Sequence, residues 1–171
     1  NTGNIAGSAY VAGIVGTNNG GTVEDVSNKG KITGSQQVVG GIVGQNKAGG
    51  KISKASNEGN VSSGNSQGAS FIGGIVGFND KSTVTNVSNS GSITGTGDYV
   101  GGICGANGNA SINIAYNTGT VQGANQVGGI AGYDGNDNQV AQSSVKNAYN
   151  TGVVSGRENI GGILGLGEYA S

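Results

Sequence analysis

The residue types that most often carry out enzyme chemistry are scarce in this chain of 171 residues. It has no His, a single Cys and nine acidic residues. Without His, a Ser–His–Asp triad, a Cys–His dyad and a zinc site with histidine ligands are all excluded. What remains is carboxylate chemistry of the kind used on polysaccharides. The carboxylates are Glu24, Asp25, Glu58, Asp80, Asp98, Asp134, Asp137, Glu158 and Glu168.

The spacing of these carboxylates does not favour catalysis. Glycoside hydrolysis needs two carboxyl groups held about 5–10 Å apart in a cleft. Glu24 and Asp25 are neighbours on an expected strand, so we expect them to face opposite sides. Asp134 and Asp137 share an expected loop, but no Arg or Lys lies next to them to complete a sugar site. The sequence therefore predicts a protein that is not an enzyme and needs no cofactor.

Two further candidates for chemistry have simple structural interpretations. The loop Asp134-Gly-Asn-Asp-Asn138 clusters oxygen ligands as calcium loops do, but it lacks the spacing and the terminal Glu of an EF-hand. We expect a solvated polar loop and no metal site. Cys104 occupies a position where five other copies of a repeated unit carry Val, Ala or Leu. A buried, small hydrophobic side chain is therefore its expected role.

Aromatic side chains are the candidates for ligand binding. Tyr10, Phe71 and Tyr99 each stand immediately before the same apolar position of the repeat, and the last two fall in adjacent repeats. Rings on adjacent coils can stack about one strand spacing apart. Such a strip can hold a glycan or a neighbouring protein; alternatively, the rings simply cover a bend. Tyr116 and Tyr149 form a second pair with the same two interpretations.

A glycine-rich unit sets the organisation of the whole chain. It reads (Val/Ile)-(Gly/Ala)-Gly-Ile-x-Gly, and its recurrence about every 28 residues means that the repeat must be interpreted first. Its central isoleucines are Ile14, Ile42, Ile75, Ile103, Ile130 and Ile163. We expect these residues to form a core ladder.

Two more motifs follow in each period. The second reads (Val/Ile)-x-x-(Val/Ala)-(Ser/Tyr)-Asn, and the third continues from that Asn as Asn-x-Gly-x-(Val/Ile). The shared asparagines are Asn1, Asn28, Asn57, Asn89, Asn117 and Asn150. Their amides can hydrogen-bond from coil to coil, or each can make only a local turn. We expect the following Gly to supply a positive φ, and the Gly-Gly pair to form a bend that uses unusual dihedrals.

Composition then decides the fold class. The chain has 38 Gly and no Pro, and Gly costs a helix about 1 kcal/mol relative to Ala. Short Val- and Ile-containing segments bounded by Gly and Asn indicate strands instead. The prediction is an all-β, parallel β-solenoid of about six coils with three short strands each, right-handed by the usual crossover preference. Residues 1–171 would form a single repeat domain of five full coils and a partial sixth, with corner insertions near 62–70 and 133–144.

The combination of these motifs resembles the GLUG repeat over essentially the whole chain. The segment Ala115-Tyr116-Asn117-Thr118-Gly119 matches the pattern well, and Ala12 in place of the first Gly is a small departure. The resemblance implies a secreted or surface-attached bacterial protein. Such repeats occur in large adhesin-like proteins and in non-catalytic parts of immunoglobulin A-specific metallopeptidases, and they bring no catalytic residues of their own.

Charge and chain ends give the expected partners. A net charge of −1 without a basic stripe argues against binding to nucleic acid. The sequence has no run of 18 apolar residues, so we expect no membrane span. Because the chain opens and closes within a period, we expect a fragment or subunit of a longer assembly, with head-to-tail self-association through uncapped ends. The predicted function is a non-enzymatic extracellular structural or adhesive module. The alternatives are a carbohydrate-binding or carbohydrate-processing solenoid and, as a minor one, an ice-binding solenoid.

Overall fold

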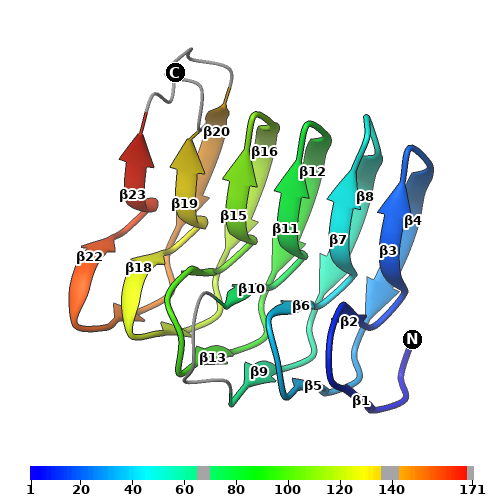
Figure 1. The fold of residues 1–171 in the computed structure, drawn as a ribbon, viewed down its shortest axis with the longest axis horizontal. Helices are drawn as coiled ribbons and strands as arrows, with labels where there is room; N and C mark the ends of the chain where they lie inside the picture. The colour runs from blue at the N-terminus through cyan, green and yellow to red at the C-terminus, as the bar shows by residue number, and fades with distance from the viewer. Residues whose placement is uncertain (65–69, 136–142, 169–171) are drawn as a thin grey trace.

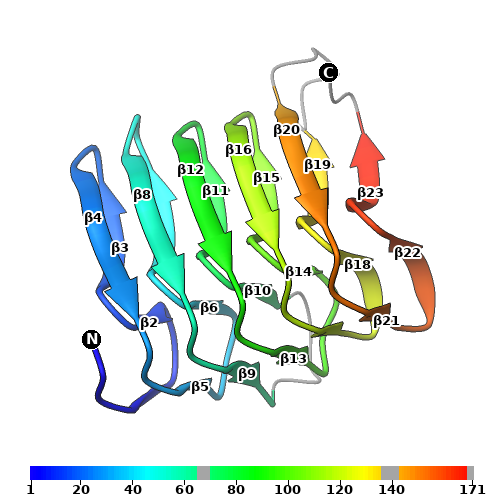
Figure 2. The same ribbon diagram turned by 180° about the vertical axis from the view of Figure 1, so that it is seen from behind.

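The chain folds as a parallel β-solenoid in which successive coils stack along one axis (Figures 1 and 2). The computed structural model describes residues 1–64, 70–135 and 143–168. Within these ranges there are strands and turns but no helix, and hence no helical segment that could cross a membrane. The all-β solenoid expected from the repeat is confirmed.

Four parallel sheets run the length of the stack, and we name them A to D. Sheet A contains β1 (Ile5–Gly7), β5 (Ile32–Gly34), β9 (Val61–Ser63), β13 (Ile93–Gly95), β17 (Val121–Gln122) and β21 (Val154–Ser155). Sheet B contains β2 (Val11–Ala12), β6 (Val38–Gly40), β10 (Phe71–Gly73), β14 (Val100–Gly101), β18 (Asn125–Gly128) and β22 (Glu158–Gly161). Sheet C contains β3 (Val15–Asn19), β7 (Val43–Lys47), β11 (Val76–Asp80), β15 (Cys104–Gly108), β19 (Ala131–Gly135) and β23 (Leu164–Glu168). Sheet D contains β4 (Thr22–Asn28), β8 (Lys51–Asn57), β12 (Thr83–Asn89), β16 (Ser111–Asn117) and β20 (Ser144–Asn150).

Each full coil has four strands rather than the expected three, because the glycine unit contributes to two sheets. In the second coil, β6 ends at Gly40 and β7 begins at Val43, with Gly41 and Ile42 in the bend between them. This bend places Val39 in one core cluster and Ile42 in another. It therefore explains why the two apolar ladders of the unit are three residues apart.

The glycines of the motifs are required by close backbone approach, not by the positive φ expected from the sequence. Among the described residues, only Gly20 and Gly49 are glycines with positive φ. A Cβ on Gly102 would collide with the carbonyl oxygen of Gly129 in the next coil and lie 2.5 Å from Cγ of Asn117. A Cβ on Gly119 would collide with the carbonyl oxygen of Gly91. The positive φ expected for these glycines is therefore wrong. Glycine is needed at these corners because adjacent coils approach too closely for any side chain.

A column of left-handed residues interrupts sheet D. Its members are Asp25, Lys54, Asn86, Ile114 and Asn147, with φ between 48° and 55°. In each case the pairing skips this residue, as between Thr85↔Asn113 and Val87↔Ala115. Because every strand of sheet D skips the equivalent residue, the left-handed conformation makes a kink that all five strands share, and this kink resets the alternation of faces. The three-residue spacing of the second motif thus keeps both of its apolar residues in the core.

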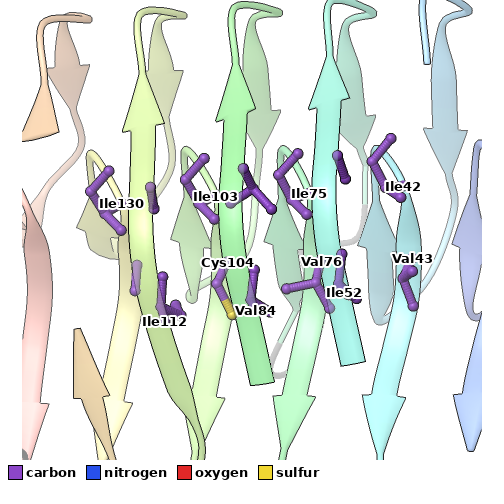
Figure 3. Close-up of a cluster of buried hydrophobic side chains, with 14 of the residues drawn as sticks. Ile42, Val43, Ile52, Ile75, Val76, Val84, Ile103, Cys104, Ile112 and Ile130 are labelled. Carbon is purple, nitrogen blue, oxygen red and sulfur yellow. The ribbon is translucent and has the colours of Figure 1, made fainter. Parts of the chain in front are cut away.

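The core consists of two clusters that run along the axis. One lies between sheets C and D and contains the four inner isoleucines of the glycine units together with Cys104 (Figure 3). The other lies between sheets A and B. Ile42, Ile75, Ile103 and Ile130 are fully buried, whereas the end members Ile14 and Ile163 are each 37% exposed. Each coil is therefore shielded by its neighbours, and the two end coils lack one neighbour each.

The motif asparagines form a continuous chain of side-chain hydrogen bonds. Each Nδ2 donates to the Oδ1 of the next coil, in the order Asn1, Asn28, Asn57, Asn89, Asn117 and Asn150, at 2.7–2.8 Å. The same Nδ2 also donates to the carbonyl oxygen two residues later, as from Asn89 to Gly91. The coil-to-coil ladder and the local turn are therefore both present.

Candidate functional site

Four aromatic rings from three consecutive coils gather where sheets B and C meet. The ring of Phe71 stacks on Phe78 at a centroid distance of 5.1 Å and on Tyr99 at 5.2 Å, with interplanar angles of 21° and 15°. Tyr99 in turn meets Tyr133 edge-on at 5.7 Å. All four side chains are half-buried. We call these four residues the aromatic cluster.

The elements that position the cluster follow from the register. Phe71 opens β10 in sheet B, and Tyr99 directly precedes β14, the next strand of that sheet. Phe78 and Tyr133 lie on β11 and β19 of sheet C, and both pair with Ala106 of β15. The sequence prediction included the first two rings and missed the other two. Alignment on the glycine unit shows them, because the residue after its last Gly is Thr17, Gln45, Phe78, Ala106, Tyr133 or Leu166.

The other predicted ring residues lie elsewhere. Tyr10 belongs to the first coil and is 47% exposed, and the intervening coil carries Val38 in its column. Tyr116 and Tyr149 pair on sheet D, with centroids 4.7 Å apart and a tilt of 38°. The structure therefore brings two of the five predicted aromatic residues into one cluster.

A groove of about 460 Å³ accompanies the aromatic cluster. It is lined by the four rings together with Asp80, Ala106, Gly108, Asn109, Gly135, Leu166 and Glu168. Its floor is low because Ala106 and Gly108 are small, while the neighbouring coils carry Phe78 and Tyr133 at the position of Ala106. The groove is thus a gap in the column of residues that follow the last Gly of each glycine unit, where Ala106 is the smallest member.

The polar groups of the groove are mainly acceptors. Asp80 is half-buried and Glu168 is exposed at the rim, and the Tyr133 hydroxyl donates to Oε2 of Glu168 at 3.3 Å. Among the described residues that line the groove, none is basic. An ionised carboxylate can only accept hydrogen bonds, so a ligand here must bring donors.

A second amide ladder, which the sequence analysis missed, lies beneath this surface in sheet C. Asn18, Asn46, Asn79 and Asn107 are linked Nδ2 to Oδ1 at 2.7–2.9 Å, and Asn107 donates to Oδ1 of Asp134 at 2.7 Å. These asparagines follow each glycine unit by two residues, so their position in the repeat was a usable signal. The ladder makes sheet C polar at a fully buried position.

Asp134 is not the loop residue that the sequence suggested. It lies within β19 and is 1% exposed, and its Oδ2 has no hydrogen-bond partner among the described residues. Burial raises the pKa of the Asp134 carboxyl above its ordinary value, and hydrogen bonding from the side chains of Asn107 and Ser143 partly opposes this. The partners expected for it in an oxygen-rich loop, Asp137 and Asn138, lie outside the described residues, as does most of both corner insertions.

The expectation that Glu24 and Asp25 face opposite sides is also wrong. Nζ of Lys54 lies 3.1 Å from Oε1 of Glu24 and 3.8 Å from Oδ2 of Asp25. Both carboxylates project outward because the left-handed conformation of Asp25 interrupts the alternation of β4. The hydrogen bond and charge of Lys54 lower the pKa of Glu24. With an exposed lysine between them, the two carboxylates belong to a surface ion-pair network.

The thiol of Cys104 is buried and unreactive. Its side chain is 0% exposed, and its Sγ lies 3.0 Å from the carbonyl oxygen of Ala106. Burial raises the pKa of the thiol far above its ordinary value, so the reactive thiolate does not form at neutral pH. Within the described ranges, no group of three or more Cys, Asp or Glu residues is placed to hold a metal ion.

The fold defines the chain as a β-solenoid repeat protein, and a family comparison adds the kind of repeat. The family model described as the GLUG motif matches residues 68–94. That segment contains one glycine unit, Ile72–Gly77, and the second motif that ends at Asn89. The match confirms the resemblance noted in the sequence for this segment. Comparisons with curated proteins and with solved structures gave no match.

Proposed function

We propose that this chain is a non-enzymatic structural module, a rigid spacer or adhesive element of a longer bacterial surface protein. The observation that carries the proposal is the unbroken register of the sheets, which pair coil to coil over the described length of the stack. Two amide ladders and two apolar clusters run parallel to these sheets. Such continuous bonding resists bending and shear between coils, which is what a spacer needs.

The two ends of the stack favour continuation by further coils or by another copy. Ile14 and Ile163, whose equivalents in the inner coils are fully buried, are each 37% exposed. Within residues 1–64, 70–135 and 143–168, the outermost strand at each end of a sheet pairs on one side only, and such an edge is a template for an additional strand. Head-to-tail stacking is therefore the self-association that we propose.

Single-molecule force spectroscopy and size measurements test this function together. We expect the folded chain to unfold in coil-sized steps only at high force, and particles in electron micrographs to lengthen as concentration rises. Monodisperse monomers at high concentration would contradict the stacking. Labelling of intact cells with antibody tests the surface location, and labelling only after lysis would contradict it.

The absence of catalysis in this proposal has its own test. The chain is incubated with a panel of polysaccharides, and new reducing ends are measured. We expect none to be released. Release that disappears when Asp80 and Glu168 are both replaced by their amides would overturn the non-enzymatic assignment.

A further inference from the structure

We propose that the groove beside the aromatic cluster binds a short, uncharged stretch of glycan. This goes beyond the spacer function, which does not require it. The groove is large enough for a small ligand, since such sites commonly measure about 300–1,000 Å³. It also spans three coils, from Phe71 and Phe78 to Tyr99 and then Tyr133, so an elongated ligand fits its shape.

The lining fits a ligand that is apolar on its faces and rich in donors at its edges. Half-buried rings supply apolar surface that a flat, C–H-bearing face can cover. Asp80 and Glu168 supply acceptors, and Asn109 offers both a donor and an acceptor. A sugar has hydroxyl groups around an apolar ring face and meets both requirements at once.

The charges around the groove discriminate between ligand classes. Two carboxylates at the rim disfavour uronates, sialylated glycans and sulfated glycans by like-charge repulsion. A strongly cationic ligand is disfavoured for a different reason. Lys81 directly follows Asp80 in the chain, and Lys47 follows Asn46, the register partner of Asn79, so two lysines stand at this end of the groove in the backbone register and add positive charge there. An uncharged ligand avoids both penalties.

The shape of the groove also gives a variant that fills it without removing a ring. Ala106 forms its floor, and its neighbour two coils earlier in the same outward column is Gln45. A Gln at this position is therefore compatible with sheet C. Ala106→Gln should place a side chain where the ligand lies, while leaving all four aromatic residues in place.

The experiment uses the full chain on a glycan array that carries neutral, sialylated, sulfated and amino-sugar glycans, with a panel of basic peptides beside it. We expect binding to neutral glycans alone. The best neutral oligosaccharide is then measured by calorimetry against Phe78→Ala, Ala106→Gln and Tyr116→Ala. The first two variants should each weaken binding about tenfold or more, which corresponds to about 1.4 kcal/mol or more, because Phe78→Ala removes a ring contact and Ala106→Gln fills the groove.

Each outcome decides the proposal. Tyr116→Ala removes a ring on sheet D, away from the groove, and should leave the affinity unchanged. Thermal melts identify any variant that fails to fold, and Ala106→Gln keeps the test valid if Phe78→Ala does fail. Silence on neutral glycans, preference for anionic glycans, binding of basic peptides instead, or unchanged affinity in the folded groove variants would each overturn it.

Discussion

The residue with the most unusual environment is Asp134, which ends the buried ladder of sheet C. Its four predecessors are asparagines that donate through Nδ2, whereas Asp134 presents a second oxygen without a described partner. At the same level of the next coil stands Gly167, which has no side chain to offer. The ladder therefore ends on a group that is better tolerated neutral than charged.

Asp134→Asn should stabilise the chain, and the gain should grow with pH. Burial raises the folded-state pKa of this carboxyl above its unfolded value of about 4. Its contribution to stability is complete below the unfolded pKa and is lost as pH rises through the raised folded pKa. Urea unfolding from pH 3 to 8 should show little difference at the acidic end and a gain of about 1–3 kcal/mol for the variant at pH 8.

Asp80→Asn is the matched control, because it removes the same charge from the outward side of sheet C. If Asp80→Asn gave the same pH-dependent gain as Asp134→Asn, the gain would not be specific to the buried carboxyl. A wild-type stability that rises between pH 4 and 8 in parallel with Asp134→Asn would contradict the assignment to Asp134.

Ile114 has a strained backbone, with φ of 55° in the left-handed column of sheet D. A β-branched side chain fits this conformation poorly, whereas Asn tolerates it. Ile114→Asn should therefore raise the free energy of unfolding by about 1 kcal/mol in chemical denaturation. The reverse change in the same column, Asn86→Ile, should lower it by a similar amount. If Ile114→Asn is instead destabilising, packing of this side chain on the outer face outweighs the backbone strain.

At the scale of elements, the corner between sheets B and C depends on glycine because the chain above it lies so close. Gly102 and Gly162 occupy the same motif position, yet a Cβ on Gly162 would meet nothing within 4 Å because no described coil lies over it. Gly102→Ala should destabilise the chain by about 3 kcal/mol or more, since the backbone of the next coil must move. Gly162→Ala should change stability by less than about 0.5 kcal/mol. Equal effects in thermal and urea unfolding would show that an intrinsic glycine conformation matters, not the approach of the next coil.

The repeat pattern was sufficient to predict the sheets but not the way each strand bends. Periodicity identified the stacked isoleucines and the parallel solenoid, because identical positions must lie over one another. It did not reveal the left-handed kink at Asp25, since Asp, Lys, Asn and Ile all occur in that column and only the three-residue spacing records it. The groove was missed for a related reason. The groove forms because Ala106 and Gly108 have no large side chain to fill it, and because aromatic rings from two different positions of the repeat lie together there.

At the scale of the whole molecule, stability should be distributed as a sum of contacts between neighbouring coils. Strands β7, β11 and β15 have a paired strand on both sides, whereas β3 and β23 have one each. Amide hydrogen exchange should therefore be slowest in the central coils and should accelerate stepwise towards both ends. Mass spectrometry of peptides from each coil measures this gradient. Uniform protection along the chain would show that the solenoid unfolds as one cooperative unit instead.

The amide chain from Asn1 to Asn150 has a further consequence, which concerns direction. Every Nδ2 in it donates towards the later coil, so the amide dipoles add along the axis instead of cancelling. One end of the rod exposes an acceptor oxygen and the other a donor nitrogen. Two copies that met through like ends would bring donor against donor or acceptor against acceptor. The solenoid therefore has two chemically different ends, and any array built by stacking it has all its subunits in the same orientation.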